Sequence, residues 1–402
     1  MMLASSALFV NCTSDPIAGP DGIAGIDGTD GIDGINGLDS TEDCRACHSS
    51  EHLDPIKESY AISMHGIETT MYNGSKLSQY GNRAECAACH TNQGFVDRFN
   101  VQDLTLVGPY SASSDQSITC NGCHNPIDGH RSFDFDTDEQ DFALRTIAPV
   151  TLIIDESVTL DAKNEVDKIG ASNTCIACHQ PTHRPPSNTE AQYTIDSGHW
   201  GPHHGPQATL VEGILGYEYS NVGISAPGSS EHSSASSCVA CHMIEGDHSW
   251  VPAATASVTC TECHDEKIEV AGFEPDMLAL AAKLELVEGW EYRYSIVRDD
   301  AGQPVLVNGK LQFLDSDGDV TADSDMYVIE LDDSGDKMKD VVIGVVNDGS
   351  PNAGFYGVEG ATFTSDEAGA AFNYLYLTED KSKGVHNPNY AKALIAQSLN
   401  AL

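Results

Sequence analysis

The sequence predicts a mostly irregular and helical fold with few strands, and a small α+β insertion near the C-terminus. Three observations lead to this prediction. The pattern Cys-x-x-Cys-His occurs six times between Cys44 and His264, which leaves only about 37 residues of chain per copy. Loops rich in Ser, Gly, Pro and Asn separate the copies, and these residues favour turns over regular elements. After His264 no cysteine occurs, and the chain shows helical and hairpin patterns.

The six copies share one spacing, which suits covalent attachment of haem. Two thiols three positions apart can add to the two vinyl groups of one porphyrin, while the histidine that follows ligates the iron. Cys-x-x-Cys alone would also suit zinc or dithiol chemistry, but a histidine directly follows the second cysteine in every copy. The predicted attachment residues are Cys44, Cys47, Cys86, Cys89, Cys120, Cys123, Cys175, Cys178, Cys238, Cys241, Cys260 and Cys263. The predicted proximal ligands are His48, His90, His124, His179, His242 and His264. We therefore expect six covalently bound haem c groups.

So short a chain cannot wrap each of six porphyrins in an ordinary hydrophobic core. We expect the macrocycles to pack against one another and to supply much of the buried apolar surface. The motif-bearing region should then contain little regular secondary structure, and it should not fold without haem.

Ten further histidines are available for the second axial position of six irons. This surplus predicts bis-histidine ligation of most haems. The favoured candidates are His65, His130, His199, His203, His204, His232, His248 and His386, with at least one ligand expected from the cluster at 199–204. His52 and His183 each follow a proximal histidine by four residues and are weaker candidates. For any single histidine the alternative is a propionate hydrogen bond or an exposed imidazole. Met64 and Met243 are interpreted as packing residues.

Two segments resemble multihaem c-type cytochromes. The segment from Cys238 to His264 contains Cys-His-Met, a histidine six residues after His242 and a second Cys-x-x-Cys-His. This segment is similar to segments of the tetrahaem cytochromes of ammonia oxidisers and the pentahaem nitrite reductases. Gly384 to Pro388 resembles a ligand-bearing segment near the end of those proteins. The resemblance implies a multihaem cytochrome c fold for the motif-bearing core and the last turn of the chain, but does not cover residues 290–365.

The composition is strongly acidic, with a net charge of −41 from 61 acidic and 20 basic residues. Such a chain repels nucleic acid and anionic lipid, and it favours basic partners or cations. We interpret the charge as a highly solvated surface rather than a specific docking site. The expected partners are redox proteins or extracellular electron acceptors, and assembly into an oligomer or filament is an open alternative.

The N-terminal residues predict export and a tether. Haem c is attached outside the cytoplasmic membrane, and Met1–Val10 resembles the end of a secretory apolar region. Cys12 is then a candidate lipid anchor, against an unremarkable thiol in a cleaved leader. From Gly19 to Gly37 every third residue is glycine, which favours an extended acidic tether over a collagen-like trimer. The expected organisation is a leader (1–12), a tether (13–42), a hexahaem domain (43–270) and a C-terminal α+β region (271–402). We expect a periplasmic or cell-surface location, with a possible lipid anchor to the outer membrane.

The C-terminal region predicts three helices, one hairpin and one candidate ion site. Helices are expected from Glu274 to about Val287, over 366–377 with Phe372, Leu375 and Tyr376 buried against a porphyrin edge, and from Asn387 to about Asn400. The Asn-Gly pair at 308–309 predicts a β-hairpin over 305–313. The candidate calcium ligands are Asp315, Asp317, Asp319 and Asp323, with a plain acidic turn as the favoured interpretation. His386, just before the last helix, would bring the C-terminus back to the haem domain.

Three functions remain open at this point. Abundant candidate axial ligands favour an electron carrier with no substrate at iron and no catalytic residues. A haem oxidoreductase acting on nitrite or hydroxylamine would need one iron with an open axial position. The nitrite reductases that this chain resembles mark that haem with lysine in place of the proximal histidine. All six copies here end in histidine, which disfavours this function. The third function is a subunit of an extracellular cytochrome filament.

Overall fold

The computed structural model describes residues 49–67, 81, 84–101, 107–110, 118–124, 142–195, 200–203, 205–219, 224, 226–250, 260–265, 269–284, 286–287, short strands between 290 and 321, 355–357 and 361–402. The chain divides into two compact units, Met1–Ser49 and Ser50–Leu402, and the described helices and strands belong to the second. Several predicted features lie outside the described residues: the leader, the tether, Cys12, the motif Cys44–His48, His130, His199, His204 and the four candidate calcium ligands.

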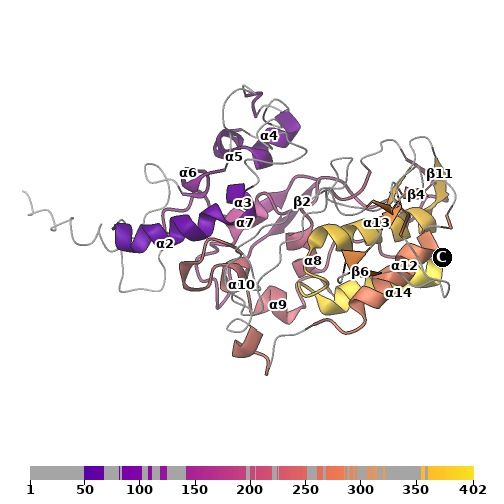
Figure 1. The fold of residues 1–402 in the computed structure, drawn as a ribbon. Coiled ribbons are helices and arrows are strands. Elements are labelled where there is room, and N and C mark those ends of the chain that lie inside the picture. The colour runs from indigo at the N-terminus through magenta and orange to yellow at the C-terminus, as the bar shows by residue number, and fades with distance from the viewer. Residues whose placement is uncertain are drawn as a thin grey trace, which may run out of the picture. The chain divides into compact units, whose positions relative to one another are not determined.

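The motif-bearing part consists of short elements joined by loops (Figure 1). Its helices are α2 (Ser50–Ala61), α3 (Met64–Ile67), α4 (Ala84–His90), α5 (Asn92–Asp97), η2 (Arg98–Asn100), α6 (Cys120–Cys123), α7 (Asn173–Ile176), α8 (Gln207–Glu212), α9 (Glu231–Ser234), α10 (Cys238–His242), η4 (Ile244–Gly246) and η5 (Cys260–Glu262). Its strands are β1 (Val150–Leu152), β2 (Asp155–Leu160) and β3 (Gln192–Thr194), of which β1 and β2 form an antiparallel hairpin.

Local hydrogen bonds explain why these helices begin and end so quickly. The Thr91 side chain accepts from the backbone N–H of Gly94 at 2.9 Å and so starts α5 directly after the second motif. Gly213 adopts a left-handed conformation with φ of 76° and ends α8. Apart from α2, with 12 residues, these helices therefore present one or two turns of side chains rather than a long face.

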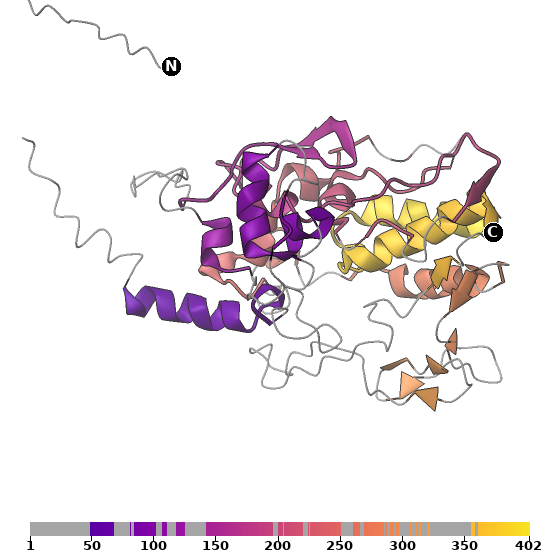
Figure 2. The same cartoon turned by 90° about the horizontal axis from the view of Figure 1, so that it is seen from above.

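Three longer helices pack together at the C-terminus. They are α12 (Phe273–Leu284), α13 (Ser365–Asp380) and α14 (Pro388–Ala401), and they lie together in both ribbon views (Figures 1 and 2). A capping box between Thr364 and Glu367 starts α13. The Asn387 side chain accepts from the Tyr390 N–H, and Pro388 occupies the first turn of α14. The three helices predicted from the sequence are thus confirmed, with α12 ending three residues early and α13 extending further at its C-terminal end.

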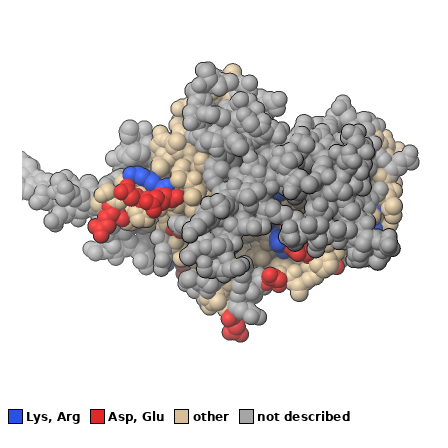
Figure 3. All heavy atoms as spheres, viewed as in Figure 1, with Lys and Arg blue, Asp and Glu red and all other residues tan. Residues whose placement is uncertain are grey.

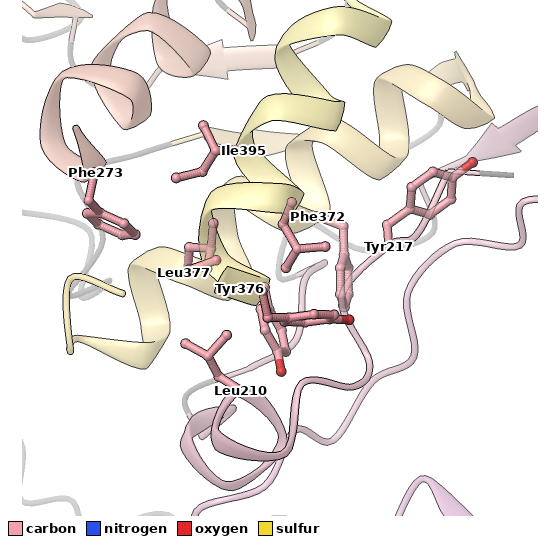
Figure 4. Packing of buried hydrophobic residues seen from close by; sticks show 10 residues of the cluster. Leu210, Tyr217, Phe273, Phe372, Tyr376, Leu377 and Ile395 are labelled. Carbon is pink, nitrogen blue, oxygen red and sulfur yellow. The ribbon is translucent and has the colours of Figure 1, made fainter. Parts of the chain in front are cut away.

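The buried face of α13 packs on protein and not, as the sequence predicts, against a porphyrin edge. Phe372 and Tyr376 are fully buried in a cluster with Leu210, Tyr217 and the apolar face of α14 (Figure 4). Gly369 permits this contact, because a Cβ atom there would lie 2.2 Å from the Tyr217 ring. The prediction was wrong because apolar periodicity shows that a face is buried but does not show what covers it.

Polar contacts fasten segment 205–219 to the C-terminal helices. The buried Asn373 side chain accepts from the Tyr217 N–H at 2.7 Å and donates to the Tyr217 carbonyl at 2.9 Å. The Tyr390 hydroxyl accepts from the Gly216 N–H at 3.0 Å. Buried backbone groups paired in this way hold a loop as firmly as a strand would. The loop between α13 and α14, which carries His386, is consequently held close to α8.

The remaining strands are short and antiparallel. β11 (Thr362–Thr364) pairs with β3, and β10 (Phe355–Gly357) pairs with β4 (Trp290–Tyr292). β5 (Ser295–Ile296), β8 (Phe313–Leu314) and β9 (Val320–Thr321) form a three-stranded sheet. β6 (Leu306–Val307) pairs with β7 (Lys310–Leu311) across the Asn-Gly pair, which confirms the predicted hairpin. The described residues include no helix with the length and apolar character needed to cross a bilayer.

We predict that Thr364→Ala weakens the start of α13. The substitution leaves the Glu367 N–H without its side-chain acceptor and should lower the free energy of unfolding of the holoprotein by about 1 kcal/mol. Guanidinium denaturation followed by circular dichroism measures this. Thr362→Ala, two residues earlier in the same strand, is the control and should have a smaller effect, since the Thr362 hydroxyl faces only the Thr194 hydroxyl at 3.4 Å. Equal losses would show that the capping box contributes nothing.

Candidate haem sites

Each described motif lies on a single helical turn. In Cys120–His124 the His124 N–H donates to the Cys120 carbonyl at 2.8 Å, and His179 and His264 make the same bond to Cys175 and Cys260. Positions i, i+3 and i+4 share one face of a helix, so the two thiols and the imidazole of a motif lie on the same side. The short α helices therefore serve to present three functional groups at once.

Each of the five described motif histidines faces a second histidine from elsewhere in the chain. The ring centroids of all five pairs lie 6.0–6.4 Å apart. The pairs are His90 with His203, His124 with His248, His179 with His65, His242 with His386, and His264 with His232. No histidine is used twice among these five pairs.

This spacing fits two imidazoles on opposite faces of one iron. A bond from an imidazole nitrogen to such a metal is about 2.0–2.1 Å long, and the ring centroid lies about 1.1 Å behind that nitrogen. Two rings that coordinate from opposite sides therefore have centroids about 6.2 Å apart. His183 and His203, neither of them in a motif, also have ring centroids 6.4 Å apart, so what distinguishes the five pairs is that each joins a motif histidine to a histidine from another segment. The residues present thus fit five bis-histidine haem sites.

Hydrogen bonds at Nδ1 orient six of these imidazoles. Their acceptors are the carbonyl oxygens of Phe142 for His124, Trp250 for His242, Val385 for His232 and Gly246 for His248, the side-chain oxygen of Gln207 for His179, and the carboxylate of Asp380 for His386. These contacts span 2.6–3.1 Å. When Nδ1 donates to an oxygen, the other nitrogen, Nε2, keeps its lone pair free for a metal.

Burial keeps several of these histidines neutral. Burial, together with the neighbouring His179, lowers the pKa of His65 to about 4. Burial also lowers the pKa of His179 and of His242. A neutral imidazole is the form that binds a metal, because a protonated one has no free lone pair. His386 differs: burial acts to lower its pKa, but the Asp380 carboxylate outweighs burial and the pKa is raised.

Thiols of different motifs lie next to one another. Cys89 and Cys178 are within hydrogen-bonding reach, as are Cys175 and Cys238. The second and fifth motifs therefore both adjoin the fourth. Because each thiol marks the attachment edge of its porphyrin, the three porphyrins would meet at these edges.

Trp250 lies among the ligands of three sites. Its ring is 4.6 Å from the His65 ring and 5.5 Å from the His248 ring, and its carbonyl oxygen is 3.0 Å from Nδ1 of His242. Tyr60 packs edge-on against it at 5.9 Å. The sequence did not reveal Trp250, Gln207 or Asp380, because no short motif marks a residue that supports a ligand from another segment.

The two weaker candidates, His52 and His183, do not face a motif histidine in any of the five pairs. His52 is exposed on α2. His183 is exposed, and its ring lies 6.4 Å from that of His203. Within the described part of the chain, no group of three or more His, Cys, Asp or Glu side chains could hold a metal ion, so the candidate ligands stand in pairs.

Comparison with known proteins finds no match among protein-family models, curated sequences or solved structures.

We predict two classes of low-spin ferric signal in electron paramagnetic resonance. The ring planes of the pairs at His90, His179 and His264 are 85–89° apart, whereas those at His124 and His242 are 34° and 48° apart. The angle between imidazole planes sets the splitting of the iron orbitals, so near-perpendicular pairs give signals with a large maximal g value and smaller angles give rhombic signals. A spectrum of the oxidised holoprotein with one class alone would contradict these geometries.

We predict that His232→Ala opens one iron. Loss of the imidazole opposite His264 should convert about one haem per molecule from low-spin to high-spin, measured by the high-spin signal in the same spectroscopy. His52→Ala removes an exposed histidine from α2 and serves as the control, with no high-spin signal expected. The absence of a high-spin signal in His232→Ala would overturn the pairing.

Proposed function

We propose that this protein is an exported multihaem c-type cytochrome that transfers electrons along a chain of six mostly bis-histidine haems. The observation that carries the proposal is the pairing of every described motif histidine with a second imidazole at a spacing that fits a shared iron. An iron with both axial positions filled by imidazole has no place for a substrate, and one-electron exchange is the chemistry left to it. The haem, when bound, supplies a one-electron ferric–ferrous couple.

The chain's own residues hold and insulate these couples. The motif cysteines attach each haem, and the paired imidazoles ligate it from both faces. Oxygen acceptors at Nδ1 keep the imidazole planes in place, so that little rearrangement accompanies a change of charge. The thiols of the second, fourth and fifth motifs adjoin one another, so haems attached there would lie close together and could exchange electrons.

The described residues favour electron transfer over the alternative of a haem oxidoreductase. That activity needs an iron with a vacant face, and none of the five described motif histidines lacks an opposing imidazole. The first motif, Cys44–His48, lies outside the described residues and is where an open iron would have to be sought.

The charge of the protein fits an exported carrier with basic or cationic redox partners. Acidic side chains gather at one place on the face shown in Figure 3, with basic side chains beside them. Within α2, Lys57 Nζ lies 3.3 Å from the Asp54 carboxylate. Complementary charge raises encounter rates with a positively charged partner and does so more strongly at low salt. Attachment of haem c itself requires export.

We predict six haems per chain and no high-spin iron in the oxidised holoprotein. The pyridine haemochrome assay gives the stoichiometry, and electron paramagnetic resonance gives the spin states. Stopped-flow mixing with dithionite and then with a soluble ferric acceptor should show full, reversible reduction. One high-spin iron that binds nitrite or hydroxylamine would replace this function with an oxidoreductase, and a chain without covalent haem would refute both.

A further inference from the structure

Two buried charges of opposite sign lie beside a row of three candidate sites, Asp380 at one end and Arg98 between the other two sites. We name these the His242 site (with His386), the His179 site (with His65) and the His90 site (with His203). The thiols place the His179 site between the other two, since Cys175 adjoins Cys238 and Cys178 adjoins Cys89. Charges beside the row can give its sites different reduction potentials.

Asp380 acts on the His242 site. Its side chain is fully buried, and its Oδ1 lies 2.6 Å from Nδ1 of His386. Its Oδ2 accepts from the backbone N–H of Ser382 at 3.1 Å. The Nδ1 contacts of His124, His179, His232, His242 and His248 end on neutral carbonyl or amide oxygens, so His386 is distinct among these six in having a carboxylate. A carboxylate that accepts from a ligating imidazole makes that ligand more basic and favours the oxidised metal.

Arg98 acts on the other two sites. Its side chain is buried on η2, and its Nη1 lies 3.6 Å from Sγ of Cys89 and 3.7 Å from Sγ of Cys178. The guanidinium also packs on the rings of Phe95 and Phe99, 5.9 and 5.8 Å from their centroids. Its described contacts include no carboxylate. A positive charge beside two attachment sites favours their reduced state, because reduction adds a negative charge nearby.

Asp167 places the His179 site between the two extremes. This buried carboxylate is bound to the backbone at Ala171 and Ser172, just before the motif, and it acts on Cys175 through its charge. Its two oxygens accept the N–H groups of Ala171 and Ser172 at 2.7 and 2.8 Å, which disperses part of its charge. The His179 site therefore has both signs of charge nearby, whereas the His90 site has Arg98 beside its second cysteine.

We propose that Asp380 and Arg98 set a downhill direction for electrons, from the His242 site through the His179 site to the His90 site. This inference rests on the proposed electron-transfer function. A reduced one-electron redox protein would give one electron to the His242 site and become oxidised. The electron would then pass to the His179 site, which reoxidises the His242 site. It would pass next to the His90 site, which reoxidises the His179 site. A one-electron acceptor then takes it. Each step moves one electron, forms or breaks no bond and moves no proton.

The wild-type holoprotein provides the first test. In a redox titration followed by electron paramagnetic resonance, the component of the His242 site should have a rhombic signal, because the planes of His242 and His386 are 48° apart, and it should have a lower midpoint potential than the components of the His179 and His90 sites. Large-g signals belong to the near-perpendicular pairs, which include the His179 and His90 sites at 89° and 85°. The His264 site, outside the row, also has near-perpendicular planes, so the components are assigned with the variants below. A rhombic component shifted by Asp380→Asn whose potential lies above that of the large-g components shifted by Arg98→Gln overturns the proposal.

Two pairs of variants test the charges separately. Asp380→Asn should raise the midpoint potential of one rhombic component, while Asp380→Glu should restore it towards the wild-type value. Arg98→Gln should lower the midpoint potentials of large-g components, and Arg98→Lys should lower them less. A structural role alone would change haem content or spin state without these opposite shifts.

Matched controls remove similar charges from nearby or comparable positions. Glu379→Gln removes a buried acid one residue from Asp380, where the carboxylate faces Lys381 Nζ at 3.9 Å. Arg184→Gln removes an exposed arginine paired with Asp155 at 3.0 Å. Both should change the potentials less than Asp380→Asn and Arg98→Gln do, and equal shifts would overturn the proposal. Six low-spin haems with no shift in either test variant would refute this inference alone, whereas a deficient haem count would refute the proposed function.

Discussion

Two imidazoles that share one iron must stand on opposite sides of it, with their ring centres about 6.2 Å apart. The described part of this protein meets that constraint five times, with spacings of 6.0–6.4 Å. One partner of each pair belongs to a motif on a short helical turn, and its position follows from local backbone geometry. The other partner comes from a distant segment. Much of the remaining structure can be understood as the means of bringing that second histidine to the correct distance.

The C-terminal helices show how this is done at the His242 site. His386 lies in the loop between α13 and α14, and both helices are anchored by buried contacts with segment 205–219. The same loop provides the Val385 carbonyl that accepts from His232, so one loop orients the candidate distal ligands of two sites. The Gln207 side chain accepts from His179 and donates to the Glu379 carbonyl at 3.0 Å, which links a third site to the end of α13. A change in α13 would therefore reach several sites through their ligand hydrogen bonds.

Charge distinguishes sites that are otherwise built alike. Acidic residues give the chain a net charge of −41, but water and salt screen those that are exposed, and their effect on any one iron would be small. Buried charges act at short range in a medium of lower polarity, where they carry more weight. Asp380 at His386 and Arg98 between Cys89 and Cys178 are charges of this kind. They give chemically similar ligand sets different surroundings.

The sequence alone predicted the attachment chemistry and determined the local elements. Two thiols and an imidazole at positions i, i+3 and i+4 share a helical face wherever one turn forms, so the motifs could be recognised without tertiary information. The helices α12, α13 and α14 and the hairpin β6–β7 were predicted for the same reason, since their period and turn residues are local. Only the tertiary structure decided the pairs, because His386 is more than a hundred residues from His242, and His65 is similarly distant from His179. It also decided that α13 buries its aromatic face on protein. Asp380, Arg98 and Trp250 lie beside candidate ligands and attachment cysteines for the same reason. Such contacts depend on the packing of distant segments and leave no pattern along the chain.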